Sequence, residues 1–290
     1  MIKSKDDFLQ YYDALKTFPD GRQRSIKVAA TAEAALKYLS ERETQELNSA
    51  VKGKTYFAFR GSEEKRSRAI NKALFLGDSF DSGILNAFLR GERDGLSAGD
   101  LNRLLYTAAI GFCAAVDLVK TGDQKTPGTF FEYFCASIFH SVIEVLPVKS
   151  LDVLNLDLEA KLPTDFIFDL GNNKPKFHVP VKTSTRERII QVWAHQRVLE
   201  GAYGMGRFLG VPMVLSENKT DSRKLLVSEI CLPAQWRLYQ LHIASMWKIV
   251  YFDLPEPYEK LNRVFPPVSV NTVGNLVCAG GALDELIGRY

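Results

Sequence analysis

Two charged residues, Asp165 and Lys182, stand at the ends of neighbouring segments that alternate like β-strands. Asp165 begins the run at 165–170, and Lys182 ends the run at 176–182, with a polar turn at 171–175 between them. Antiparallel pairing across this turn would bring both side chains to the same end of a β-hairpin. We therefore predict that the acid and the lysine converge.

Glu132 lies in a helical segment that precedes the hairpin and could add a second carboxylate. Carboxylates hold hard divalent cations such as Mg²⁺, and a lysine can orient the attacking water and offset negative charge in the transition state. This combination suits metal-assisted hydrolysis of a phosphodiester. The alternative for Asp165 and Lys182 is an ordinary surface ion pair beside a turn.

The segment Arg186-Glu187-Arg188 follows the hairpin and opens a second helix. Arginine donates bidentately to guanine and glutamate accepts from cytosine N4, so this trio suits a run of G·C pairs in the major groove. The alternative is a helix N-terminus that Ser184 or Thr185 caps, with Glu187 near the positive end of the helix dipole and two solvated arginines.

Hydrophobic periodicity predicts the elements that position these side chains. In the first half of the chain, apolar residues recur at helical spacing in 8–15, 29–47 and 101–119, with one strand-like interruption at 55–59. We therefore predict a mostly helical N-terminal region over residues 1–125, which would wrap DNA or form a dimer interface.

The pattern changes after a polar break at 120–128. Thr126 is expected to cap the next helix, with Pro127 in its first turn. The predicted elements are then a helix at 128–145, the hairpin, a helix at 188–200 and strands at 211–216, 224–231 and 247–252. This order predicts an α/β catalytic core over 126–290, with a mixed central β-sheet flanked by helices.

Composition excludes several classes of protein. The chain has 290 residues, 46% hydrophobic and 24% charged, which is typical of a globular protein and argues against disorder or a coiled coil. The longest apolar run, 104–119, contains Asp117 and is too short for a membrane span, and the N-terminus has no signal-peptide pattern, so we expect a cytoplasmic protein. The net charge of +3 is compatible with a positive groove on a balanced surface.

The order and spacing of these residues resemble type II restriction endonucleases of the PD-(D/E)xK superfamily, in the branch that reads CCGG or CCNGG sites. The resemblance covers about 126–201. Residues 163–165 match the first acidic motif, Lys182 the motif lysine, and Glu132 the glutamate of the preceding helix. The segment 186–188 matches the Arg-(Asp/Glu)-Arg recognition element of that branch.

The chain departs from this pattern at the second metal-binding carboxylate. Position 180 is proline, and the resemblance then places the carboxylate in the next helix, where this chain has His195 and Gln196. On a helical wheel Gln196 shares the apolar face with Glu200, whereas His195 points away from its centre. We therefore expect Gln196, replaced or assisted by Glu200, to complete the site. The alternatives are a buried hydrogen-bonded amide for Gln196 and a surface carboxylate for Glu200.

The resemblance implies a Mg²⁺-dependent, homodimeric endonuclease that hydrolyses phosphodiester bonds in double-stranded DNA at a G·C-rich site, with pairing of dimers left open. Asp165 and Glu132 would bind the metal, and Lys182 would position the water. Phosphate contacts are expected from Arg60, Lys65, Arg66, Arg68 and Lys72. Two alternatives remain: a non-cleaving DNA-binding protein on a decayed nuclease scaffold, and a soluble α/β protein with no nucleic-acid role.

Overall fold

The computed structural model describes residues 7–62, 65–152, 161–171, 174–185, 189–264 and 268–289. The helices of the first half are α1 (Asp7–Thr17), α2 (Arg22–Ser40), α3 (Ser82–Leu89), α4 (Ala98–Val119) and α5 (Lys125–Ile143). Those of the second half are α6 (Ile189–Tyr203), α7 (Pro233–His242), α8 (Glu256–Glu259), α9 (Val273–Val277) and α10 (Ala282–Ile287). Short 3₁₀ turns lie at Gly77–Ser79 and Lys260–Arg263.

The helices predicted at 8–15, 101–119 and 128–145 are confirmed as α1, α4 and α5. The prediction that helical structure continues to residue 47 is wrong, because α2 ends at Ser40 and strand β1 (Thr44–Ser49) follows. β1 pairs with the predicted strand β2 (Tyr56–Phe59), whose residues are all buried. Pairing with a neighbouring strand overrides the local helical pattern here.

The prediction that Thr126 caps α5 is also wrong. α5 begins at Lys125, so Thr126 lies inside the helix, and the Asp123 carboxylate accepts the backbone N–H groups of Lys125 and Thr126 at 3.0 and 2.9 Å. The Thr126 hydroxyl donates to the same carboxylate at 2.6 Å. Asp123 therefore satisfies the first amides of α5, and Pro127 lies in the first turn, where its missing N–H costs nothing.

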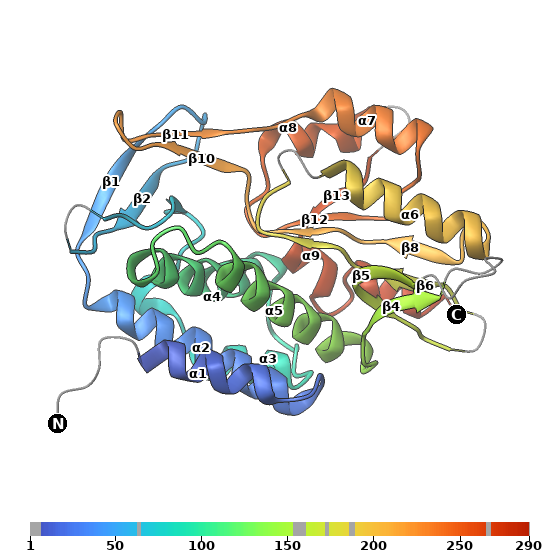
Figure 1. Cartoon of the computed structure of the whole chain (residues 1–290), viewed down its shortest axis with the longest axis horizontal. Helices are drawn as coiled ribbons and strands as arrows, with labels where there is room; N and C mark the ends of the chain where they lie inside the picture. The colour runs from blue at the N-terminus through green and yellow to red at the C-terminus, as the bar shows by residue number, and fades with distance from the viewer. Residues whose placement is uncertain are drawn as a thin grey trace.

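One sheet combines strands from both halves of the sequence. Its order is β10 (Asn218–Asp221), β11 (Leu226–Glu229), β1, β2 and β3 (Ile70–Asn71). β1 pairs in parallel with β11, and β10 and β11 form an antiparallel hairpin. Figure 1 shows this hairpin reaching across to β1 and β2.

The remaining strands form a mixed sheet in two parts. The first has the order β4 (Val148–Asp152), β5 (Lys161–Phe168), β6 (Lys176–His178) and β8 (Phe208–Gly210). The second has the order β13 (Val270–Thr272), β12 (Ile249–Tyr251), β9 (Met213–Val214) and β7 (Val181–Lys182).

Two continuous segments join these parts, because β6 leads into β7 and β8 leads into β9. Backbone hydrogen bonds from Val211 to His178 (2.7 Å) and from Met213 to Pro180 (2.8 Å) continue the parallel ladder across the break. Pro180 has no N–H to donate, which interrupts regular pairing at this point. The predicted mixed sheet flanked by helices is confirmed.

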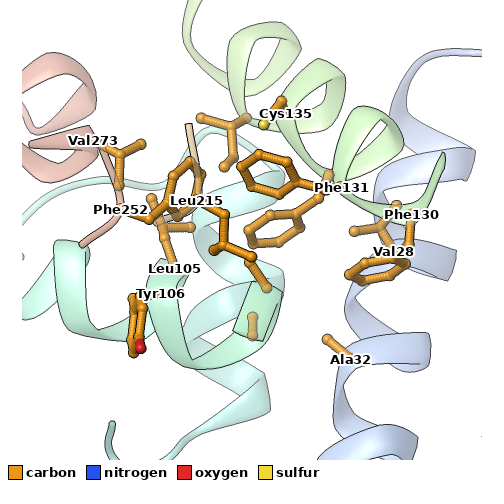
Figure 2. Packing of buried hydrophobic residues seen from close by; sticks show 14 of the residues in the cluster. Val28, Ala32, Leu105, Tyr106, Phe130, Phe131, Cys135, Leu215, Phe252 and Val273 are labelled. Atoms are coloured by element: carbon orange, nitrogen blue, oxygen red, sulfur yellow. The ribbon is translucent and has the colours of Figure 1, made fainter. Parts of the chain in front are cut away.

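Figure 1 shows α4 and α5 on one side of the mixed sheet and α6 and α7 on the other. The main hydrophobic core includes residues from Phe8 to Leu286, so it extends across the predicted boundary at residue 125. In Figure 2, Phe130 and Phe131 of α5 lie among side chains of α2 and α4 and those of Leu215 and Phe252, which directly follow β9 and β12. α4 is long and apolar enough to span a membrane, but 83% of its most apolar window is buried in the protein, as in a core helix.

Candidate active site

The predicted hairpin is present and brings Asp165 to Lys182. β5 and β6 pair antiparallel through Ile167 with His178 and Phe168 with Phe177. Lys182 Nζ donates to Asp165 Oδ2 at 2.8 Å, and the two side chains are 29% and 24% exposed. The predicted convergence is confirmed, and both groups remain accessible to a ligand.

The division of the sheet explains why Asp165 faces this lysine. Up to Val179, whose N–H donates to Phe166 O at 2.9 Å, the chain is bonded to the backbone of β5. The next donor, the N–H of Val181, bonds instead to Asp165 Oδ2 at 2.8 Å. β7 then pairs with β9. The aspartate side chain thus takes the place of a ladder acceptor where the strands separate.

Glu132 lies on α5 within electrostatic reach of this pair. Burial raises the pKa of the Glu132 carboxyl, and the negative charge of Asp165 raises it further. The positive charges of Lys149 and Lys182 act in the opposite direction. The structure therefore groups two carboxylates and two lysines, of which the sequence analysis had not identified Lys149.

His195 is a second residue that the sequence analysis did not select. It is half-buried on α6, and burial lowers the pKa of its imidazole. The charge of Asp165 opposes this shift and that of Lys182 adds to it, which places the ring within electrostatic reach of the pair. Its position in the helix after the motif lysine was the available signal, but the helical wheel favoured Gln196.

Gln196 forms a buried hydrogen-bond network on the other face of α6. Its Oε1 accepts from His178 Nδ1 at 3.0 Å, while its Nε2 donates to Phe208 O at 2.9 Å and to Glu200 Oε1 at 3.2 Å. Gln196 is fully buried and Glu200 is nearly so. The amide oxygen that a metal ion would need is therefore already bonded to His178.

Burial lowers the pKa of His178 to about 4, so its imidazole is neutral near pH 7. Because Gln196 presents an oxygen, Nδ1 carries the proton in this network. Gly210, the β8 partner of His178, packs against the amide so closely that a Cβ there would lie 3.0 Å from Gln196 Oε1. Packing and hydrogen bonds together hold the amide in one orientation.

The donor set at the site fits Mg²⁺. Among the described residues, no group of three or more His, Cys, Asp or Glu side chains is placed to hold a metal ion. Mg²⁺, however, is commonly bound by one or two carboxylates, with waters and substrate phosphate as the other ligands. Asp165 and Glu132 supply that number of carboxylates beside Lys182.

Arg186, Glu187 and Arg188 lie outside the described residues. The residue before them, Thr185, is buried, and its N–H lies 3.1 Å from Glu217 Oε2. Its hydroxyl also donates to the Glu217 carboxylate, which accepts the hydroxyl of Tyr251 at 2.8 Å. The described chain that ends at Thr185 is therefore attached to the core through Glu217.

Most of the predicted phosphate-binding side chains have partners within the protein. Arg68 makes a bidentate ion pair with Asp117, with contacts of 2.7 and 2.8 Å. The other observed pairs are Arg60 with Glu43 (3.8 Å), Arg66 with Gln45 (2.6 Å) and Lys72 with Glu46 (2.6 Å). Within the described part of the chain, the Lys65 ammonium has no hydrogen-bond or salt-bridge partner.

Comparisons with known proteins address the fold. No family model and no curated protein matches the sequence. The crystal structure of the type IIP restriction endonuclease Kpn2I is similar over 99% of this chain and 96% of that chain, with 24% identity and a TM-score of 0.77. The restriction endonuclease PspGI in complex with substrate DNA matches 66% of this chain and 78% of that chain, with 12% identity and a TM-score of 0.42. On the similarity to Kpn2I, the chain has a restriction-endonuclease-like fold.

Proposed function

We propose that this protein is a type II restriction endonuclease that hydrolyses phosphodiester bonds of double-stranded DNA with Mg²⁺. The observation that carries the proposal is the Asp165–Lys182 contact at the division of the sheet, with Glu132 in electrostatic reach. A surface ion pair beside a turn would not require a second, half-buried carboxylate within electrostatic reach of it. The restriction-endonuclease-like fold adds support.

Each residue would have a distinct part in the reaction. Asp165 and Glu132 would hold Mg²⁺, which supplies Lewis acidity and lowers the pKa of bound water. Lys182 would orient the water for in-line attack and stabilise the negative charge that develops on the phosphate. The Asp165–Lys182 contact keeps the ammonium in place before substrate binds.

Recognition is proposed for the segment 186–188. Arg186 and Arg188 would read guanines and Glu187 the adjacent cytosines, which favours a site of the CCGG or CCNGG type. The residue before this segment, Thr185, is buried and bonded to Glu217, so the described chain that leads into the segment is part of the core.

A homodimer is proposed because a palindromic site matches a two-fold symmetric protein. α6 and α7, which pack against each other, carry the exposed apolar side chains Ile190, Val198, Leu238 and Leu241. These residues are the candidates for the contact between protomers, and the active site of each protomer would cut one strand.

The test is incubation of the purified protein with unmethylated phage DNA and Mg²⁺. The wild type should produce discrete fragments whose ends identify the site, and Asp165→Ala and Lys182→Ala should not. Lys176→Ala is the matched control, since Lys176 and Asp169 form a 2.6 Å ion pair on the same hairpin. Cleavage should stop in EDTA, and intact DNA with both Mg²⁺ and Mn²⁺ would reject the proposal.

One observation favours the second candidate, a non-cleaving DNA-binding protein. The residues where the resemblance expects the second carboxylate are His195 and Gln196, and Gln196 is bonded to His178. Such a protein would bind duplex DNA at low salt and cut none with any metal ion, whereas the proposed nuclease would bind in Ca²⁺ and cut in Mg²⁺.

A further inference from the structure

The pairing of β4 with β5 is irregular at the candidate site. Val148 lies opposite Ile167, but Ser150 lies opposite Pro163. Between these pairs, one β4 residue, Lys149, faces the three β5 residues 164–166. Such a bulge inserts extra residues into one strand and redirects their side chains. Asp165 lies at the centre of the bulge, so Lys149 is the β4 residue that faces this part of β5 on the adjacent strand.

Two aromatic rings, each belonging to a residue next in sequence to a candidate carboxylate, lie near the Lys149 ammonium. Its Nζ lies 5.2 Å from the ring centroid of Phe166 and 5.4 Å from that of Tyr133. Phe166 follows Asp165 on β5, and Tyr133 follows Glu132 on α5. Contact with two rings restricts a long, flexible side chain to the space between these two elements.

No carboxylate of the described residues lies within salt-bridge distance of Lys149, although other lysines of this sheet are paired. Lys182 is bonded to Asp165 and Lys176 to Asp169. The Lys149 charge acts on Glu132 and lowers the pKa of its carboxyl against the effect of burial. Lys149 is also exposed, so its ammonium can bind an anionic ligand from solution.

We propose that Lys149 binds a backbone phosphate of the DNA strand that lies against Asp165 and Glu132. This inference rests on the proposed function, since it takes duplex DNA as the ligand. An ammonium is a compact cation that binds phosphate oxygens, and such a contact positions the strand without reading its sequence. A cation close enough to act on Glu132 also reduces the repulsion that an approaching phosphodiester meets.

The first test measures how DNA binding depends on salt in Ca²⁺, where the nuclease should bind without cutting. The slope of log Kd against log salt concentration should fall by about one for each Lys149 in the complex when Lys149→Met is compared with the wild type. Lys149→Arg keeps the charge and should keep the slope. Lys224→Met is the matched control, because Lys224 is an exposed lysine in the turn between β10 and β11, at the other end of the molecule from β4 (Figure 1).

The second test locates the contact on the DNA. Duplexes that carry one neutral methylphosphonate at each position around the cut are bound by the wild type and by Lys149→Met. At the contacted phosphate, the losses from the variant and from the modified duplex should not add, since both remove the same interaction. Lys149→Gln provides a second neutral side chain on this exposed strand, and thermal denaturation checks that each variant is folded.

Additive losses at every position, or an unchanged salt slope in a folded Lys149→Met protein, would overturn the inference while leaving the proposed function intact. A wild type that binds no duplex at low salt would overturn both. The slope of log Kd against log salt concentration could also fall by the same amount in Lys149→Arg as in Lys149→Met. The effect would then depend on the shape of the side chain and not on its charge, which would contradict a phosphate contact.

Discussion

The Lys182 ammonium lies 2.8 Å from Asp165 Oδ2, and the same oxygen accepts the N–H of Val181. Asp165→Asn would remove the negative charge while leaving a side chain of the same shape. Because the pair is partly exposed, we expect unfolding free energy to change by less than about 1 kcal/mol. Loss of metal binding and of lysine orientation should reduce cleavage by roughly 10² or more.

Single-turnover cleavage in Mg²⁺ and duplex binding in Ca²⁺ check this prediction for Asp165→Asn. Affinity should stay within a few-fold of the wild type, and Asp169→Asn on the same hairpin should cleave normally. Equal cleavage by Asp165→Asn and the wild type would remove Asp165 from the reaction.

Gln196→Leu should lower the stability of the folded protein. It would leave the Nδ1–H of His178 and the carbonyl of Phe208 without the amide partner that they now have in a buried region. An unsatisfied buried polar group costs about 1–3 kcal/mol, so the denaturation midpoint should fall clearly. His195→Ala, at a half-buried position on the same helix, should lower the midpoint less.

Denaturant unfolding and Mn²⁺ affinity measured in parallel separate these two roles. If Gln196→Leu weakens Mn²⁺ binding while keeping wild-type stability, Gln196 is a metal ligand as the resemblance suggests, and the hydrogen-bond network is not its main function.

His178 should make the fold sensitive to acid. Its folded-state pKa is about 4, because burial and the charges of His195 and Lys182 lower it more than Gln196 and Asp165 raise it. Between pH 6.5 and pH 4 the unfolded chain binds a proton that the folded protein excludes, so stability falls as the pH decreases. The full effect is of the order of 3 kcal/mol.

Unfolding measured from pH 7.5 to pH 4.5 checks this prediction. His178→Asn retains an N–H donor for Gln196 and does not titrate, so its stability should change less steeply over the same range. The same slope in both proteins would assign the acid sensitivity to other groups.

Asp253→Ala should unfold both halves of the chain together. Asp253 is buried, and its carboxylate accepts from Lys54 at 2.6 Å and from Asn71 at 3.0 Å. Lys54 also bonds to Glu229 at 2.7 Å. Removing one partner from a buried ion pair costs about 3–5 kcal/mol, whereas loss of the exposed Asp169–Lys176 pair should cost less than about 1 kcal/mol.

Near-ultraviolet circular dichroism of the tryptophans, all three of which lie in 126–290, is compared with far-ultraviolet circular dichroism, which follows the helices of the whole chain. A single transition, shifted to lower denaturant in Asp253→Ala, is expected because β1 and β11 share a sheet and the core spans residue 125. Two separate transitions would show that the regions 1–125 and 126–290 fold independently.

Local sequence pattern determined several of the helices and strands, and the central pair of the candidate site. Alternation over 165–170 and 176–182, with a polar turn between, is enough to specify a hairpin and to place Asp165 near Lys182, since side chains on paired strands follow a period of two. Helical spacing likewise determined α1, α4 and α5. These features depend on residues that are close together in the sequence, so the local pattern is enough to predict them.

Tertiary structure decided everything that depends on distant partners. The sequence predicted a strand at 224–231, where β11 lies, but the parallel pairing of β11 with β1 from the other half of the chain appears only in the tertiary structure. The bulge that sets Lys149 opposite Asp165 depends on the register of two strands, and a helical wheel could not show that the fully buried Gln196 would bond to His178 while His195 came within reach of the Asp165–Lys182 pair. Strand register and side-chain burial depend on packing over the whole molecule, so a local sequence pattern cannot predict them.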